Sequence, residues 1–187
     1  EAAATKPFGF MPFYPGPGLG GHCIPIDPHY LSWKLKSLDY DAKFIALAEV
    51  MNSSMPNYVV SKITEALNSH QKSVNGSYVM IIGIAYKPNI NDMRESPAID
   101  IISKLLDKGA AVSFHDNLNP TFKHNNQILE SKELTQSHLE SADCVVLISP
   151  HDETDIEFIT QHAKLIIDTR NKTKNTTTTN KSKVFKI

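Results

Sequence analysis

The residues from 78 onward alternate between apolar runs and amphipathic stretches, and this alternation restricts the possible folds more than any other feature. The run Tyr78–Ala85 is continuously apolar, as expected of a strand buried on both faces of a sheet. We expect further strands at 110–115, 143–149 and 164–168, with helices between them. The expected helices span 97–108, 134–141 and 156–162. Right-handed crossovers between such elements predict an α/β fold, a Rossmann-like doubly wound parallel sheet.

The remaining stretches give weaker signals. Residues 117–130 are polar and indicate no regular element, and residues 1–4 resemble the last turn of a helix. The segment 171–183, rich in Thr, Asn and Lys, predicts a mobile loop, and residues 184–187 a short final strand.

A long helix is predicted before the sheet. Apolar residues recur at a spacing near 3.6 at Phe44, Leu47, Ala48, Met51, Met55, Val59, Ile63 and Leu67. Pro56 should kink this helix or divide it near Ser53. The stripe must pack either in the core of its own subunit or against a second chain. Asn75-Gly76 predicts a turn, so we expect a helical segment over 1–73 and a sheet domain over 74–187.

A glycine- and proline-rich loop precedes these elements. The eight residues from Tyr14 to Gly21 contain four glycines and two prolines, which suit a loop wrapped around a polar ligand. The loop leads to Cys23 and Asp27, with a short helix expected from Pro28 to Lys36 and Asp27 as its N-cap. A thiol ahead of a helix N-terminus is a candidate nucleophile. Cys23 could instead be a small buried apolar residue.

Two further interpretations of this loop are open to test. His22, Cys23, Asp27 and His29 could ligate a metal, although the chain has no C-x-x-C and no second ligand cluster, so we predict no metal site. Gly16, Gly18 and Gly21 match G-x-G-x-x-G, with Asp39 or Asp41 as the ribose-binding acid. Such a fingerprint must follow a strand, and two prolines within residues 10–15 argue against one.

Three cations stand next to the expected strand and helix ends. Lys87 follows the first strand, Arg94 precedes the helix that Ser96 should cap, and Arg170 follows the fourth strand. Because ligands of such sheets bind beyond the carboxyl ends of the strands, these cations predict a phosphate site. The alternative is that they are solvated surface charges.

Composition excludes several classes. The net charge of −1 gives no electrostatic case for nucleic acid or an anionic membrane. We expect no transmembrane helix and no secretory signal. The two cysteines are far apart, which suggests a reducing compartment, the cytoplasm, and Cys144 lies in an apolar run that predicts a core position.

Two segments resemble a known family. GFMPFYPGPGLGGHCIPIDPHYLSWK is similar to the catalytic-cysteine segment of the UDP-glucose/GDP-mannose dehydrogenases, and GIAYKPNINDMRESPA to the signature of their C-terminal UDP-binding domain. The resemblance implies that Cys23 is the nucleophile and that Asp27 assists the water and proton steps. It implies that Arg94 reaches the NAD cofactor. The substrate-binding residues it implies are Tyr14, Gly18, Gly20, Gly21, Tyr86, Lys87 and Arg170.

The resemblance also implies an activity. Family members oxidise C6 of a nucleotide sugar twice with NAD, through a cysteine thiohemiacetal and thioester. Ile26 stands where many relatives acting on UDP-glucose or GDP-mannose have lysine, which favours a UDP-N-acetylhexosamine. The chain resembles the later part of such an enzyme, with NAD bound mainly by a domain absent from it. We therefore expect it to be inactive alone and to form a homodimer through the 42–69 helix.

Three alternatives remain. The chain could be a non-catalytic UDP-sugar-binding or assembly module, or it could act on UDP-glucose or GDP-mannose. It could also be a cysteine hydrolase, which would need a histidine base near Cys23. His22 is adjacent in sequence but is expected to point elsewhere.

Overall fold

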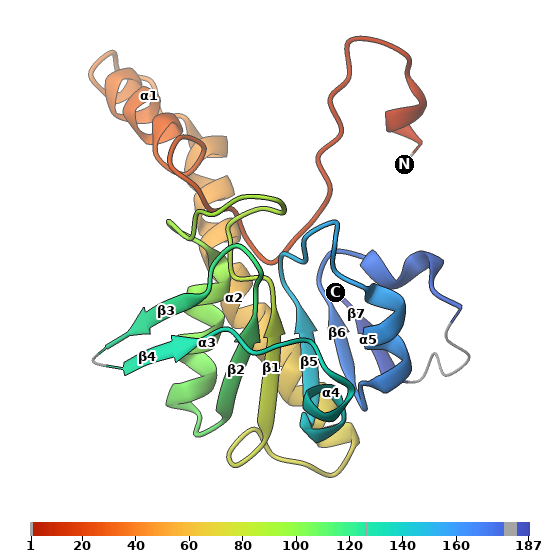
Figure 1. The fold of residues 1–187 in the computed structure, drawn as a ribbon. Coiled ribbons are helices and arrows are strands. Elements are labelled where there is room, and N and C mark those ends of the chain that lie inside the picture. The colour runs from red at the N-terminus through yellow and green to blue at the C-terminus, as the bar shows by residue number, and fades with distance from the viewer. Residues whose placement is uncertain (1, 126, 178–182) are drawn as a thin grey trace.

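The computed structural model describes residues 2–125, 127–177 and 183–187. A five-stranded sheet in the order β2-β1-β5-β6-β7 forms its centre, and each neighbouring pair is parallel (Figure 1). The strands are β1 (Tyr78–Ile82), β2 (Ala111–His115), β5 (Cys144–Leu147), β6 (Ile166–Asp168) and β7 (Val184–Lys186). The predicted α/β class with a parallel sheet is confirmed, as is the short final strand.

Helices cover both faces of this sheet. The helices α2 (Lys43–Ser69) and α3 (Pro97–Asp107) pack on one face, which includes Val79 and Ile81 of β1. The opposite face, with Met80 and Ile82, packs against α4 (Gln136–Ser141) and α5 (Ile156–His162). Successive β1 side chains therefore enter two different cores, which explains why the whole strand is apolar. Cys144 is fully buried in the first core, as predicted, and burial raises the pKa of its thiol.

Several boundaries differ from the expectation. β1 ends at Ile82 rather than Ala85, because Gly83 has φ +79° and a Cβ there would collide with the Ser149 carbonyl. The stretch 117–130, for which no element was predicted, contains an antiparallel hairpin of β3 (Thr121–His124) and β4 (Gln127–Glu130). The polar sequence concealed it, since Phe122 alone is buried among the described residues of the hairpin.

The two ends of the chain show the remaining differences. The helical turn expected at 1–4 is a 3-10 turn, η1 (Ala3–Thr5), and Glu1 lies outside the described residues. Within the predicted 171–183 loop, η2 (Lys172–Asn175) forms a second 3-10 turn. Residues 178–182 of that prediction lie outside the described residues.

The helical segment departs from the prediction in two places. α1 (Asp27–Lys36) has Ile26, not Asp27, at its N-cap position, because the Asp27 amide already donates to the Cys23 carbonyl. α2 runs unbroken through Pro56, so the predicted division did not occur. Its second half is buried from Pro56 onward, whereas the first half is exposed and extends beyond the sheet with α1 (Figure 1). Within the described parts of the chain, no helix has the length and apolarity needed to cross a bilayer.

Candidate functional site

The glycine-rich loop crosses the carboxyl edge of the sheet. Gly16 lies against the Arg170 guanidinium, which a Cβ at that position would hit. A Cβ on Gly20 would lie 2.5 Å from the Glu95 carbonyl oxygen, and one on Gly21 would lie 2.8 Å from the Tyr86 ring. The Gly21 amide donates to the Arg94 carbonyl at 3.0 Å. The loop therefore docks on segments that follow β1 and β6, and glycine is required at positions 20 and 21, where a side chain would meet the Glu95 backbone and the Tyr86 ring.

α2 anchors the same loop from the other side. The Leu19 amide donates to Oδ1 of Asn52 at 2.8 Å, and Gly18 lies over Pro97 with φ +132°. Asn52 is four residues before Pro56, so its carbonyl has no helical N–H partner at that turn. Sequence reasoning missed Asn52; a polar side chain beside a mid-helix proline was the available signal.

Cys23 lies just beyond the docked part of the loop. Its side chain is exposed, and its carbonyl accepts hydrogen bonds from the amides of Ile26 at 3.0 Å and Asp27 at 2.8 Å. These bonds close one turn, which places the thiol directly ahead of α1, as predicted. The expectation that His22 points elsewhere is wrong, because its Nδ1 lies 4.0 Å from the Cys23 sulfur.

Arg94 forms a fixed guanidinium beside the loop. Its Nε and Nη2 donate to both carboxylate oxygens of Asp92 at 2.6 to 3.0 Å. The Arg94 hydrogen bond lowers the pKa of Asp92 to about 2, and the Asp92 carboxylate raises the pKa of Arg94. Tyr86 and Cys23 add smaller contributions to the latter shift, so the thiol lies within electrostatic reach of the guanidinium. The role of Asp92 as its partner was not predicted.

Arg170 is the most enclosed of the three cations. Its Nε donates to the Ile148 carbonyl at 3.2 Å, and burial lowers the pKa of its guanidinium. The buried Asp168 carboxylate accepts from the Arg170 amide at 3.1 Å and from the Thr173 amide at 2.8 Å. The backbone after β6 is therefore held in place, and the guanidinium is directed across the end of β5 toward the loop.

Tyr86 and Lys87 occupy the turn after β1. Tyr86 is half-buried beneath Gly20 and Gly21, and its amide donates to the Asp92 carbonyl at 3.0 Å. Lys87 is exposed, with Nζ 5.6 Å from the centre of the Tyr86 ring. Ser96 caps α3, as predicted, by accepting from the Ala98 amide.

Five of the predicted residues lie together at one edge of the sheet. Gly20, Gly21, Tyr86, Arg94 and Arg170 converge where β1, β5 and β6 end, which includes the switch point of the sheet. Tyr14 is 64% exposed on the approach to this edge. Among the described residues, no cluster of three or more His, Cys, Asp or Glu side chains is suited to a metal.

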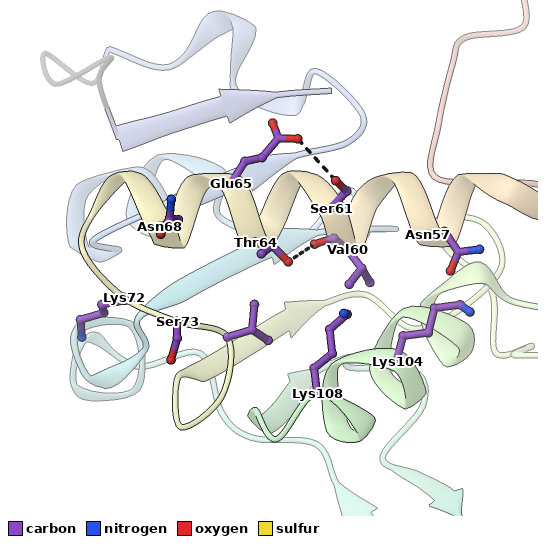
Figure 2. Close-up of a pocket in the computed structure, with 11 residues that line it drawn as sticks. Asn57, Val60, Ser61, Thr64, Glu65, Asn68, Lys72, Ser73, Lys104 and Lys108 are labelled. Atoms are coloured by element: carbon purple, nitrogen blue, oxygen red, sulfur yellow. Dashed lines mark hydrogen bonds between the residues drawn. The ribbon is translucent and has the colours of Figure 1, made fainter.

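A separate cavity lies at the opposite end of the molecule. It has a volume of about 730 Å³ between α2 and α3, and the lysines Lys104 and Lys108 extend toward it (Figure 2). Residues 72–74, which also line it, lead into the start of β1. Lys104 lies in the last turn of α3 and Lys108 is its C-cap residue, where cations complement the helix dipole. This cavity is distinct from the edge at which the predicted residues converge.

Comparison with known families agrees with this arrangement. Residues 80–175 match the UDP-binding domain of the UDP-glucose/GDP-mannose dehydrogenase family, and residues 1–54 match its central domain. The UDP-N-acetyl-D-mannosamine dehydrogenase of Methanocaldococcus jannaschii is 38% identical over 165 residues, which cover 84% of this chain and 35% of that protein. The UDP-N-acetyl-D-glucosamine 6-dehydrogenase of Pseudomonas aeruginosa is 37% identical over 62% of this chain and 27% of its own length.

A solved structure shows the same fold. The UDP-D-ManNAc dehydrogenase of Pyrococcus horikoshii superimposes with a TM-score of 0.73 and 27% identity, over 91% of this chain and 39% of that one. This chain thus spans about a third of the length of the curated relatives that it matches. Because the family's models match residues 80–175 of the sheet domain and residues 1–54 with the cysteine loop, the chain belongs to the UDP-glucose/GDP-mannose dehydrogenase family.

Proposed function

We propose that the chain is the substrate-binding and cysteine-bearing part of an NAD-dependent dehydrogenase that oxidises C6 of a UDP-N-acetylhexosamine to the uronic acid. One observation carries this proposal: the loop that bears Cys23 is docked on the strand ends that present Tyr86 and Arg170. A nucleophile and the cations suited to a pyrophosphate therefore share one edge of the sheet.

The UDP-sugar is bound by the following groups. Arg170 and Lys87 pair with the pyrophosphate, since guanidinium and ammonium groups make strong charge-assisted hydrogen bonds to phosphate oxygens. Tyr86 forms one wall of the site, and Gly18, Gly20 and Gly21 allow the ligand to approach the backbone. Tyr14, exposed on the approach, closes over the sugar side. These assignments rest on the family motifs and on the observed convergence at the strand ends.

Cys23 is the covalent nucleophile in this proposal. Its thiolate adds to the C6 aldehyde produced by the first oxidation, which forms a thiohemiacetal. Loss of a hydride and a proton from this adduct gives the thioester, and water then releases the uronic acid and the thiol. Asp27, within one turn of Cys23, assists the water and proton steps. The thiol must remain reduced between turnovers, which suits the cytoplasm.

NAD, when bound, supplies the hydride acceptor for each oxidation. Of the described residues, Arg94 suits this cofactor, because its exposed guanidinium is oriented by Asp92 and lies within electrostatic reach of Cys23. Its charge complements the cofactor's pyrophosphate or a carboxamide oxygen. We assign most contacts to NAD to residues outside this chain. We therefore expect the pure chain to produce no NADH from a UDP-sugar and NAD.

An N-acetylhexosamine is the favoured substrate for two reasons. Ile26 replaces the lysine common among relatives that act on UDP-glucose or GDP-mannose, and the curated relatives named above are N-acetylmannosamine and N-acetylglucosamine enzymes.

The exposed half of α2 and its neighbour α1 supply a dimer interface in this proposal. Their exposed apolar side chains are Tyr30, Leu31, Trp33, Phe44, Leu47, Val50 and Met51. Exposed apolar side chains gathered on two neighbouring helices favour association. We propose a homodimer, because the stripe continues the buried face of the same helix.

Alkylation of the cysteines tests the proposed site directly. Iodoacetamide should label the exposed Cys23 and spare the buried Cys144. UDP-N-acetylglucosamine or its manno epimer should slow the labelling of Cys23, whereas GDP-mannose should not. Cys23→Ser identifies the labelled residue. Labelling of Cys23 at an unchanged rate in chain saturated with the UDP-sugar would place the thiol away from the sugar and contradict the proposed chemistry.

A further inference from the structure

A buried carboxylate organises the turn that carries Tyr86 and Lys87. Asp116, at the end of β2, is 1% exposed. Its Oδ2 accepts from the amides of Ile84 at 2.9 Å and Ala85 at 3.3 Å, the two residues before Tyr86. Burial alone would raise the pKa of Asp116, but hydrogen bonds from His151, Ile84 and Asn119 outweigh it and hold that pKa below its ordinary value. The first half of the turn is therefore fixed to an anion.

His151 connects this carboxylate to the second half of the turn. Its Nε2 lies 2.9 Å from Asp116 Oδ1, and its Nδ1 lies 2.8 Å from the Asn89 amide nitrogen. A backbone N–H can only donate, so Nδ1 must be the acceptor and Nε2 must carry the proton. The 6% exposed ring is thereby fixed as one neutral tautomer, with both nitrogens satisfied.

Asn89 is also held through its side chain. Its Nδ2 donates to Asp152 Oδ2 at 2.6 Å, and its Oδ1 accepts from the Asp152 amide at 3.0 Å. Asn89 has φ +64°, a left-handed conformation that asparagine tolerates better than most residues. The turn is therefore fastened at 84–85 and at 89, on either side of Tyr86 and Lys87, which extend from it.

We propose that Asp116 and His151 are positioning residues for the nucleotide site, which hold the 84–92 loop in the conformation that presents Tyr86 and Lys87 to the pyrophosphate. This inference rests on the proposed role of Lys87 in UDP-sugar binding. Neither residue needs to touch the ligand. Their effect on affinity must therefore pass through the loop, and this distinguishes them from residues that contribute to stability alone.

A double-mutant cycle tests the coupling. His151→Gln retains a donor near the position of Nε2 but offers no acceptor at that of Nδ1, so it releases the Asn89 amide. Titration of the intact chain with UDP-N-acetylglucosamine should show affinity about tenfold weaker in this variant. Lys87→Ala should also weaken binding, and the double variant should be no weaker than Lys87→Ala by more than about twofold. His138→Gln, in α4, is the matched control and should bind like the unsubstituted chain.

Hydrogen exchange of the unliganded chain provides a second readout. Amides within 84–92 should exchange faster in His151→Gln and unchanged in Lys87→Ala and His138→Gln. If His151→Gln does not fold, Asp152→Ala removes the Asn89 side-chain partner from a 73% exposed position and should shift both readouts in the same direction.

The possible outcomes distinguish failure of the positioning role of Asp116 and His151 from failure of the proposed nucleotide site. Normal affinity in His151→Gln with weakened Lys87→Ala would overturn the positioning role alone, as would fully additive losses in the double variant. Unchanged affinity in Lys87→Ala, or no binding by the unsubstituted chain, would overturn the proposed nucleotide site and this inference with it. Faster exchange throughout the chain in His151→Gln would assign His151 a structural role only.

Discussion

At the scale of single residues, the glycines of the cysteine loop are explained by what lies next to them. Gly16 lies against Arg170, and Gly20 and Gly21 both lie against Tyr86, so a Cβ at any of the three positions would come closer than 3.0 Å to these side chains. These contacts are the physical reason for a glycine-rich sequence that, taken alone, indicated only a ligand-binding loop.

Gly16→Ala should weaken UDP-sugar binding without unfolding the chain. The added Cβ would collide with the end of the Arg170 side chain, a flexible group that can move aside. We expect affinity about tenfold lower and a stability change within about 1 kcal/mol, because Gly16 is a half-buried loop residue whose nearest neighbours are all atoms of one flexible side chain. Calorimetric titration and urea denaturation measure these two quantities. Gly9→Ala, with no atom within 4 Å of its Cβ, is the control for affinity; equal affinity in Gly16→Ala would remove Arg170 from the site.

The sequence indicated the residues of the proposed site that carry distinctive chemistry and missed those that hold them in place. Cys23, Arg94 and Arg170 could be identified from loop composition and strand ends. Asp116 and His151 could not, because the loop partners described above lie 31 to 62 residues away in sequence and only the fold brings them together. Asn52 had only the weak signal of a polar residue one turn before a mid-helix proline. A buried histidine hydrogen-bonded to backbone has no local sequence signature.

At the scale of elements, the two halves of α2 lie in different environments. Its second half is part of the sheet's core, while its first half is apolar and exposed. The sequence predicted one continuous stripe, and periodicity alone could not show that half of it leaves the core. Of the two expected effects of Pro56, a kink or a division, the division did not occur, because packing of the second half on the sheet and α3 stabilises the helix across the missing hydrogen bond.

The two halves of α2 should respond differently to truncation. Ile63→Ala, at a fully buried position, should cost about 2–5 kcal/mol of unfolding free energy. Leu47→Ala, 55% exposed, should cost less than about 0.5 kcal/mol per monomer but weaken the proposed dimer. Urea denaturation and analytical ultracentrifugation distinguish these effects. A monomeric unsubstituted chain at high concentration would contradict the dimer for this chain.

The start of β1 should make stability depend on pH. The Asp143 carboxylate accepts from the Lys72 ammonium and, at 2.9 Å, from the Tyr78 amide. Burial alone would raise the pKa of Asp143, but these bonds bring it below its ordinary value. The stabilisation is therefore present above the unfolded pKa and is lost as the pH falls through the lower, folded pKa.

Asp143→Asn measures this contribution. It should be about 1 kcal/mol less stable than the unsubstituted chain at pH 7, after allowance for solvent screening. The difference should shrink as the pH falls below about 4, where the unfolded carboxyl binds a proton. Chemical denaturation at a series of pH values provides the comparison, and a gap that stays constant down to pH 2 would be inconsistent with titration of Asp143.

At the scale of the whole molecule, the essential feature is the docking of the cysteine loop across the carboxyl edge of the sheet. The alternation of strands and helices was sufficient to predict the parallel α/β sheet, and the switch-point rule is the reason for proposing a ligand site at its carboxyl edge. The placement of the loop on that edge required the structure, because it joins Gly16 to Arg170 and Gly21 to Arg94 across long stretches of chain.

Calorimetric titration of the 187-residue chain with UDP-N-acetylglucosamine, with GDP-mannose as the control ligand, tests the central claim most directly. The account predicts binding that is selective for the UDP-sugar and weakened at least tenfold in Lys87→Ala and in Arg170→Ala. Binding of neither ligand, or binding that both substitutions leave unchanged, would mean that this edge of the sheet is not the nucleotide site.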